Sequence, residues 1–289
     1  MSSQPGTLVL LSLATACGPR ALDTVDAPDP PDVDAAPLEP TGALTIAPDV
    51  VSGCPSTGPE VYSPYRAPGA YPHDTVAVLP WRGDGAMYPN GTEDFSNYGT
   101  LPQTVECGDD KKLRSYLDVT AGCLTAVQLG TYTRGKITAT SDGYYRSIAL
   151  GYASGTSLPA KWTDQATEYR FFYAAATGTN GNPGFKAFLR YRTEDDLYVA
   201  SWRTDGVAQI QKKHCGDYTP LIILPAFGAP TPNAWHTIRF TALGPKLDLY
   251  LDGAHVATAN DPNFTWGTTG IRIDSMDGAY IDDWKVFAP

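Results

Sequence analysis

Apolar and polar residues alternate with a period of two over much of the C-terminal half of the chain. Between residues 235 and 258, the apolar side chains at every second position are Ile238, Phe240, Ala242, Leu247, Leu249 and Leu251. Successive side chains of a β-strand point to opposite faces, so this period predicts half-buried strands. The stretch predicts three short strands. Gly244-Pro245 separates the first from the second, and Asp252-Gly253 predicts a two-residue hairpin turn between the second and the third.

The same pattern predicts further strands on both sides of this stretch. They cover residues 131–138, 144–152, 169–175, 185–192, 197–203, 207–213, 270–273 and 279–287. The 28 Gly and 25 Pro residues fit short strands joined by tight turns, and residues 177–184 have a turn-forming composition. No segment has a sustained helical period, and no internal repeat is found. The pattern therefore predicts an all-β fold, a two-sheet antiparallel β-sandwich.

Four of these segments also carry a resemblance to known proteins. They are residues 235–238 (WHTI), 249–256 (LYLDGAHV), 270–272 (GIR) and 281–286 (IDDWKV). They resemble the laminin-G-like, concanavalin A-like jelly-roll family, including its bacterial relatives associated with glycan metabolism. Residues 168–173, 185–192, 197–202 and 207–213 extend this resemblance, which covers roughly the last half of the chain. The resemblance implies a concanavalin A-like jelly-roll domain over residues 51–289 and a polysaccharide ligand.

The negative charge of the chain is concentrated near its N-terminus. Seven carboxylates between Asp23 and Asp49 and the single base Arg20 give residues 1–49 a charge of −6. This leaves −4 of the total of −10 for residues 50–289. No cluster of Lys and Arg that could collect phosphates is found along the chain. The charge distribution therefore argues against nucleic-acid binding.

The N-terminal segment predicts export. Residues 7–16 (TLVLLSLATA) form an apolar run that ends at Cys17. A membrane span needs about 20 residues, so this run predicts the apolar part of a signal peptide within residues 1–17. Leu13 to Cys17 resembles the lipobox of bacterial lipoproteins, which implies a lipid anchor on Cys17 and a place at the cell envelope. The alternative is an ordinary secretory signal cleaved near Ala16.

Residues 18–50 predict a disordered linker between the N-terminal signal and the sandwich. The segment is rich in Pro, Asp and Glu and has few side chains to bury. Such a composition does not offset the entropy lost on folding, and proline together with like charges keeps the chain extended. A stalk that separates a folded domain from a membrane surface needs these properties.

The cysteines favour disulfides over a metal site. If Cys17 carries a lipid, four cysteines remain: Cys54, Cys107, Cys123 and Cys215. An even number in an oxidising compartment predicts two disulfides with three alternative connectivities, of which we favour Cys107–Cys123 because these residues flank a predicted strand region at 112–117. The spacing lacks the close Cys-x-x-Cys pair that zinc sites use.

Basic and aromatic residues on the predicted strands 185–192, 197–203 and 207–213 suggest a ligand-binding strip. Arg190 and Arg192 share one face of their strand, as do Tyr198 and Trp202, and Lys212 and His214, on theirs. If these faces align, the strip crosses the sheet. Such a strip would suit an acidic glycan, because aromatic faces pack on sugar rings and cations pair with acidic sugars. The predicted ligand-binding residues are Arg190, Arg192, Tyr198, Trp202, Lys212, His214 and Tyr218. A non-catalytic carbohydrate-binding protein is therefore the first functional hypothesis, and ordinary solvated strand faces are the alternative.

Catalysis is the second hypothesis, and an adhesive or structural envelope lipoprotein is the third. Glycanases on this fold place carboxylates on one strand in the form Glu-x-Asp-x-x-Glu, and Glu194 to Val199 matches this only in its first part. A polysaccharide lyase needs a cation or amide that neutralises the uronate and a Tyr or His as base, roles that Arg192, His214 and Tyr218 fit. Other lyase motifs are absent, so we assign no catalytic residue.

Metal sites and cofactors receive little support from the sequence. His73, His236 and His255 lie apart, without carboxylates or cysteines at metal-ligand spacing, which predicts structural roles. A structural Ca²⁺ is conceivable near Asp282 and Asp283, with Asp274 and Asp277 as neighbouring oxygen ligands. No metal ligand is assigned on this basis.

Overall fold

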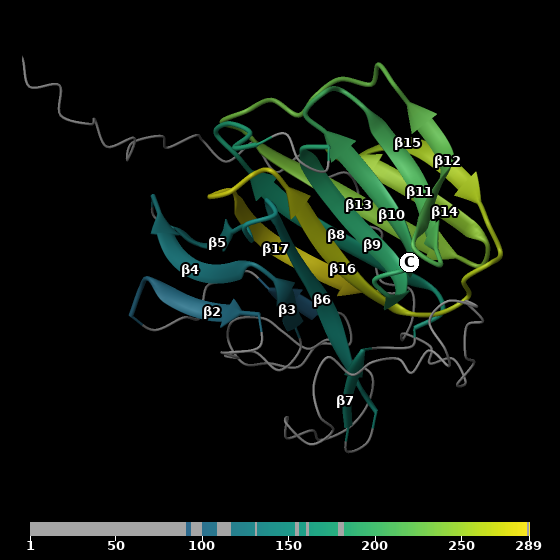
Figure 1. The fold of residues 1–289 in the computed structure, drawn as a ribbon, viewed down its shortest axis with the longest axis horizontal. Helices are drawn as coiled ribbons and strands as arrows, with labels where there is room; N and C mark the ends of the chain where they lie inside the picture. The colour runs from purple at the N-terminus through teal and green to yellow at the C-terminus, as the bar shows by residue number, and fades with distance from the viewer. Residues whose placement is uncertain are drawn as a thin grey trace, which may run out of the picture.

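The computed structural model describes residues 91–93, 100–108, 117–130, 132–153, 156–159, 162–178, 182–287 and 289. The predicted signal peptide, the linker at 18–50, Cys17, Cys54 and His73 lie outside the described residues. In the described part, no helix is long and apolar enough to cross a membrane. All regular elements there are β-strands, which form two antiparallel sheets (Figure 1). The predicted two-sheet sandwich is thereby confirmed.

The nine-stranded sheet contains the stretch with the clearest alternation. Its strand order is β15 (Ala254–Asn260), β14 (Lys246–Leu251), β13 (Trp235–Leu243), β8 (Gln165–Phe172), β17 (Tyr280–Phe287), β5 (Tyr132–Thr138), β4 (Cys123–Leu129) and β2 (Gln103–Cys107). A short strand, β1 (Gly91–Glu93), pairs with residues 284–286 of β17, the strand that lies between β8 and β5. Strands β4 and β5 lie at one end of the molecule and β14 and β15 at the other (Figure 1).

The eight-stranded sheet lies against the first. Its order is β12 (Asp217–Leu224), β11 (Ala208–His214), β10 (Asp196–Arg203), β9 (Gly184–Thr193), β16 (Thr268–Asp274), β6 (Tyr144–Ala153) and β3 (Leu117–Ala121). Strand β7 (Thr156–Pro159) pairs with β6 at the margin. Strands β9 to β12 follow one another along the chain as hairpins, which brings the predicted ligand-binding strip onto neighbouring strands.

The predicted hairpin turn at Asp252-Gly253 is confirmed. Asp252 has φ 48° and Gly253 has φ 77°, so both central residues take the left-handed conformation that a two-residue turn of type I′ requires. Glycine adopts it without steric cost, and Asp tolerates it better than most residues. Ile238 consequently faces Leu251 and Phe240 faces Leu249 across the β13–β14 ladder, so the apolar sides of the two strands coincide.

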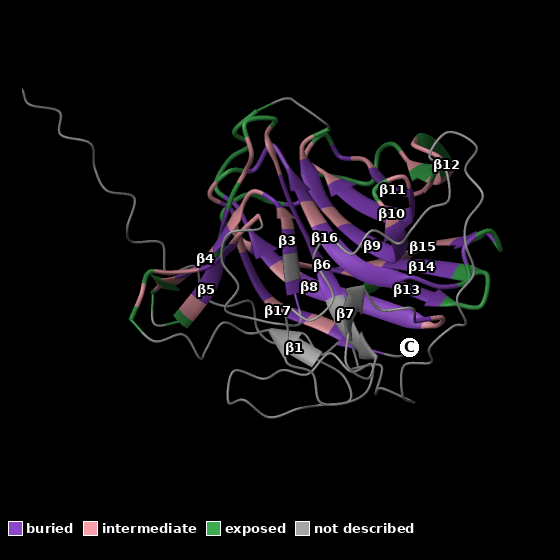
Figure 2. Cartoon of the chain, turned by 60° about the horizontal axis from the view of Figure 1, so that its bottom comes forward, coloured by how far each residue is buried: buried purple, intermediate pink, exposed green. Residues whose placement is uncertain are grey.

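The two sheets enclose one large apolar core. Its fully buried members include Phe171 and Phe185, whose rings stack with centroids 3.7 Å apart. The central strands are buried over most of their length, and exposed residues concentrate in the turns (Figure 2). A second cluster contains Phe188 and Val199, which alternate with core residues and so lie on the other face of the eight-stranded sheet. Strands β9 and β10 are therefore buried on both faces.

The disulfide Cys107–Cys123 is confirmed. The two residues face each other in the β2–β4 ladder, with their Cα atoms 4.1 Å apart. Cys215 is disulfide-bonded as well, and its partner lies outside the described residues. The first bond joins neighbouring strands that are close in sequence, whereas Cys215 lies in the turn between β11 and β12.

Candidate functional site

Arg190, one of the predicted ligand-binding residues, has a structural role instead. Its buried guanidinium donates to three backbone carbonyl oxygens, those of Thr163 (3.1 Å), Phe264 (2.7 Å) and Gly244 (2.6 Å), and lies 3.6 Å from a carboxylate oxygen of Asp164. A guanidinium has five donors in a planar fork, which suits it to join several chain segments at once. Arg190 thus ties three loops together and offers no surface to a ligand.

Tyr198 and Trp202 share one face of β10, as predicted, but this face is the inner one. Both rings belong to the core between the sheets, and Tyr198 is fully buried. The Trp202 indole donates to the carbonyl oxygen of Gly228 (2.8 Å). The Tyr198 hydroxyl contacts Oδ1 of Asp261 (2.6 Å) and accepts from the amide of Phe264 (3.0 Å), while burial raises its pKa. The two residues therefore support the site from below and do not line a groove.

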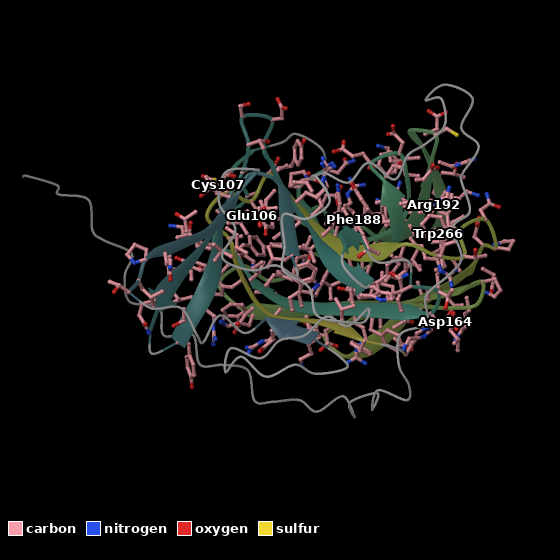
Figure 3. All side chains as sticks on the ribbon, turned by 90° about the horizontal axis from the view of Figure 1, so that it is seen from below. Glu106, Cys107, Asp164, Phe188, Arg192 and Trp266 are labelled. Atoms are coloured by element: carbon pink, nitrogen blue, oxygen red, sulfur yellow. A yellow bond between two sulfur atoms is a disulfide. The ribbon has the colours of Figure 1, made fainter. Side chains whose placement is uncertain are left out.

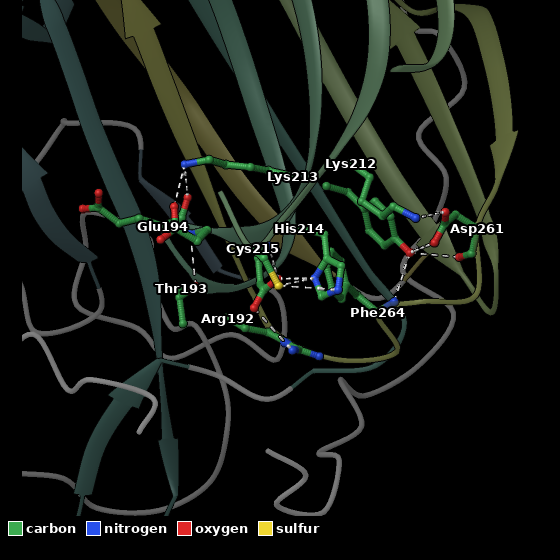
Figure 4. A network of polar contacts seen from close by, with 12 residues as sticks. Arg192, Thr193, Glu194, Lys212, Lys213, His214, Cys215, Asp261 and Phe264 are labelled. Carbon is green, nitrogen blue, oxygen red and sulfur yellow. Dashed lines mark hydrogen bonds and ion pairs between the residues drawn. The ribbon is translucent and has the colours of Figure 1, made fainter. Parts of the chain in front are cut away.

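The remaining predicted residues gather where β10 begins and β11 ends. We define the His214 cluster as Arg192, Asp196, His214, Cys215, Phe264 and Trp266. His214 is 44% exposed at its side chain, and its Nδ1 lies 2.6 Å from Oδ1 of the fully buried Asp196. The Cys215 sulfur lies 3.7 Å from both ring nitrogens, and the ring meets Phe264 edge-on at 5.5 Å (Figure 4). Asp196 thus fixes one edge of the imidazole, and the His214 side chain remains partly exposed.

Arg192 packs under this imidazole on two aromatic rings. Its guanidinium carbon lies 4.8 Å from the ring centre of Phe264 and 5.2 Å from that of Trp266, and Nη2 is 3.7 Å from Asp196. Figure 3 shows Arg192 and Trp266 close together, far from Cys107 at the other end of the molecule. Stacking of a desolvated guanidinium on aromatic rings is worth up to about 2 kcal/mol. Arg192 therefore stabilises the cluster and compensates the buried charge of Asp196.

Lys212 belongs to a second network beside the cluster. Its ammonium group lies 2.8 Å from Oδ2 of Asp261, whose Oδ1 accepts from the amide of Asn263 (2.9 Å). Burial raises the pKa of Asp261, but the hydrogen bonds from Lys212 and Tyr198 outweigh it and lower the pKa below its ordinary value. The ion pair fixes the loop that supplies Phe264, so Lys212 acts on the site through this loop (Figure 4).

Tyr218 is the most exposed of the predicted residues, at 50%. It lies on β12, and the Lys213 ammonium group is 5.3 Å from its ring centre. Lys213 in turn bonds Oδ1 of Asp195 (2.9 Å) and the carbonyl oxygen of Glu194 (2.7 Å). Because Lys213 faces Tyr218 in the β11–β12 ladder, an exposed phenol and a cation lie side by side on the face of the hairpin opposite to that of Lys212 and His214.

The three carboxylates at 194–196 do not form a glycanase-like set. Glu194 pairs with Arg146, Asp195 with Lys213, and Asp196 with His214 and Arg192. They lie in and next to the β9–β10 turn and point to different partners. A retaining glycosidase needs two carboxyl groups about 5 Å apart on either side of one bond, whereas these three carboxylates are each bound to different cationic side chains.

One group of potential metal ligands occurs in the described part of the chain, and it lies in the His214 cluster. Ligand atoms of Asp196, His214 and Cys215 are within 4.8 Å of one another. The Cys215 sulfur is committed to a disulfide and cannot act as a thiolate ligand. The residues considered for Ca²⁺ do not meet in such a group among the described residues: Asp274 pairs with Lys186 and Arg272, Asp282 with Arg134, and Asp283 with Arg170.

His236 has the structural role that its isolation predicts, and its contacts imply a pH dependence. Its Nδ1 lies 2.8 Å from Oδ2 of Asp252 and its Nε2 lies 2.9 Å from the carbonyl oxygen of Thr231. Only the imidazolium donates from both nitrogens. Burial lowers the pKa of His236, but the hydrogen bond and charge of Asp252 and the Thr231 carbonyl outweigh it, so the pKa is raised.

We therefore expect the free energy of unfolding to fall as the pH rises through the raised pKa of His236. The stabilisation is complete below the pKa of the unfolded chain, about 6.5, because the folded state binds the proton more tightly. Urea unfolding of the wild type and of His236→Gln across pH 5 to 9 checks this. A decline of equal steepness in both proteins would contradict the assignment.

The chain segment 261–266 supplies residues that the sequence pattern did not single out. Asp261, Phe264 and Trp266 follow β15 in a stretch without periodicity. The available signal was the pair of aromatic residues spaced by two within a turn-like composition. Asp196 was considered only as part of a glycanase pattern, and its actual role is to orient His214.

Comparisons with known proteins give only distant structural similarity. No family model and no curated protein matches the chain. Among solved structures, the carbohydrate-binding module CBM66 from Bacillus subtilis is 16% identical, with a TM-score of 0.45, over 60% of this chain and 95% of the module. The β-glucanase of Bacillus licheniformis is 14% identical, with a TM-score of 0.43, over 69% of this chain and 98% of the enzyme.

Lectin II from Ulex europaeus is a third similar structure. It is 12% identical, with a TM-score of 0.40, over 61% of this chain and 93% of the lectin. Binding modules, lectins and a glucanase thus appear together among the similar structures. Since one fold hosts many functions, likeness at this level assigns none of them to this chain, and its function must be argued from its own residues.

Proposed function

We propose that this protein is a non-catalytic carbohydrate-binding protein, and that polysaccharide contacts the tip of the β11–β12 hairpin, which carries His214, Lys213 and Tyr218. The observation that supports this most is the exposed imidazole of His214, held at Nδ1 by the buried Asp196. A ring that is already fixed loses little entropy when a sugar ring packs on it. The phenol of Tyr218 offers a second aromatic face, and the ammonium group of Lys213 a donor to sugar hydroxyl or carboxylate groups.

The same geometry supports a polysaccharide lyase as second candidate. A histidine whose Nδ1 is held by a carboxylate is a suitable general base through its Nε2, and Tyr218 lies on the neighbouring strand. A lyase also needs a group that neutralises the uronate. Arg192 is stacked on Phe264 and Trp266 beneath the surface, and Lys213, which lies on the other face of β11, is held by Asp195 and Glu194. We therefore rank binding without turnover first.

Tyr218→Ala and His214→Ala are each expected to weaken polysaccharide binding by about 5- to 30-fold, because each removes one sugar-packing face worth about 1–2 kcal/mol. The measurement is calorimetric titration of the purified full-length protein against a panel of neutral and uronate-containing polysaccharides. Leu243→Ala, which removes a side chain of similar exposure (56%) from the β13–β14 turn, should bind as the wild type does. Unchanged binding in both site variants would exclude this surface.

A further inference from the structure

The outer face of the nine-stranded sheet carries a regular arrangement of cations and aromatic rings far from the His214 cluster in the fold. The registers place Trp235, Phe172 and Tyr280 next to one another across β13, β8 and β17, and Lys136 of β5 follows Tyr280. Ring centres are 5.7 Å apart for Phe172 and Trp235 and 6.1 Å apart for Phe172 and Tyr280. This row of three aromatic rings and one lysine spans four neighbouring strands.

A row of charged residues runs parallel to it on β8, β17 and β5, two positions away from the first row on each strand. Asp282 faces Arg170 in the β17–β8 ladder, and its Oδ2 lies 2.5 Å from Arg134 of β5. Both guanidinium groups lie over the Trp235 ring, Arg170 at 5.0 Å and Arg134 at 5.2 Å. We define the aromatic–cation face as Tyr132, Arg134, Lys136, Arg170, Phe172, Trp235 and Tyr280.

The charges of this face differ from those of the rest of the chain. A third row, on β13, β8 and β17, adjoins these two. The described charged residues of the three rows are five cations (Arg134, Lys136, Arg170, Arg239 and Lys285) and three carboxylates (Glu168, Asp282 and Asp283). The whole chain, in contrast, has a net charge of −10. A cationic surface on an acidic protein complements an anion.

Asp282 changes the balance further. It is buried, and its Oδ1 has no hydrogen-bond partner among the described residues. Burial and the neighbouring Asp283 raise the pKa of Asp282 to about 8, against the lowering effect of Arg134 and Arg170. The other groups on this part of the face are Lys136 of β5, Glu168 of β8, and Tyr280 and Lys285 of β17. Deprotonation of Asp282 as the pH rises therefore adds negative charge beside the two arginines.

We propose that the aromatic–cation face is a second binding site, specific for sugar chains that carry carboxylate or sulfate groups. The anionic group pairs with the cations of the face, for which Lys136 and Arg170 are the accessible partners. The sugar ring packs on Tyr132, which is 54% exposed and stacks on Arg134 at 4.6 Å, and on the half-buried Tyr280. This site does not depend on the His214 cluster, since no residue is shared.

The test uses the full-length protein with three probes: oligogalacturonate, dextran sulfate and neutral dextran. Lys136→Glu and Tyr132→Ala, both on exposed side chains, should weaken binding of an anionic probe by at least about fivefold. The matched control is Lys246→Glu, which makes the same charge change on an exposed lysine of β14 and should have less effect. Binding of oligogalacturonate alone, of dextran sulfate alone or of both identifies the anionic group.

The outcomes for the two sites are distinct. Tyr218→Ala should leave binding at the aromatic–cation face intact, and Lys136→Glu should leave the His214 surface intact. Binding of the anionic probe should also weaken as the pH rises past about 8, and Asp282→Asn should abolish this decline. The proposal is overturned if neither anionic probe binds, if neutral dextran binds equally well at this face, or if Lys136→Glu and Lys246→Glu have equal effects.

Discussion

Replacement of Arg190 by methionine is expected to lower the free energy of unfolding by about 3–5 kcal/mol. Methionine keeps most of the aliphatic bulk but donates no hydrogen bond. The carbonyl oxygens of Thr163, Phe264 and Gly244 then lose their partner at once, in a place where little water reaches them. Urea unfolding followed by tryptophan fluorescence measures the loss.

Arg203→Met is the matched control for this prediction. Arg203 also donates to side chains, those of Asn182 and Asp205, but these bonds lie at the surface. Exposed ion pairs contribute about 0–1 kcal/mol, so this variant should unfold close to the wild type. If Arg190→Met were no less stable than Arg203→Met, Arg190 would not hold the loops together, and its role as a ligand-binding residue would regain support.

Gly267→Ala is expected to destabilise the fold by about 3 kcal/mol or more, since overpacking against backbone cannot be relieved by a side-chain rotation. A Cβ at this position would lie 2.3 Å from the carbonyl carbon of Arg190 and 2.6 Å from its Cα. Gly267 also exchanges two backbone hydrogen bonds with Trp162, each 3.0 Å long. The chain thus needs a residue without Cβ where β16 approaches β9. Thermal unfolding monitored by circular dichroism measures the effect.

Gly228→Ala separates the steric clash from the backbone conformation. The φ angles of Gly267 (+155°) and Gly228 (+117°) are both unfavourable for an L-residue, but a Cβ at Gly228 would meet nothing within 4 Å. Only the strain of the backbone remains, about 1–3 kcal/mol. Equal destabilisation in the two variants would show that the close approach between Gly267 and Arg190 contributes little.

The sequence pattern predicted the sandwich and most strands from β5 onward, because period-two alternation and turn residues are local signals, but it did not predict β2, β3, β4, β7 or β12. It predicted β13, β14 and their turns, and the shared face of Tyr198 and Trp202 on β10. It did not predict which way this face points. Seven of the eight residues of β10 are buried, since both faces of the strand are covered, so polarity no longer distinguishes the inner face from the outer.

The composition of the candidate site depends on contacts between segments distant in sequence. Phe264 and Asp261 come from a loop about 50 residues after His214 and Lys212. Arg190 bonds loops that precede it and loops that follow it in the sequence. No local period encodes such contacts. The pairing of Cys107 with Cys123 was predictable because the two residues are only 16 positions apart and their strands are adjacent.

The most direct test of the central claim follows the His214 imidazole by NMR while polysaccharide is added to the full-length protein, with simultaneous ultraviolet detection of unsaturated uronate ends. A non-catalytic binding surface at His214 predicts saturable shifts of its ring signals and no unsaturated product. Binding that leaves these signals unchanged would place the ligand elsewhere. Accumulation of unsaturated ends, lost in His214→Ala, would show that the protein is a lyase.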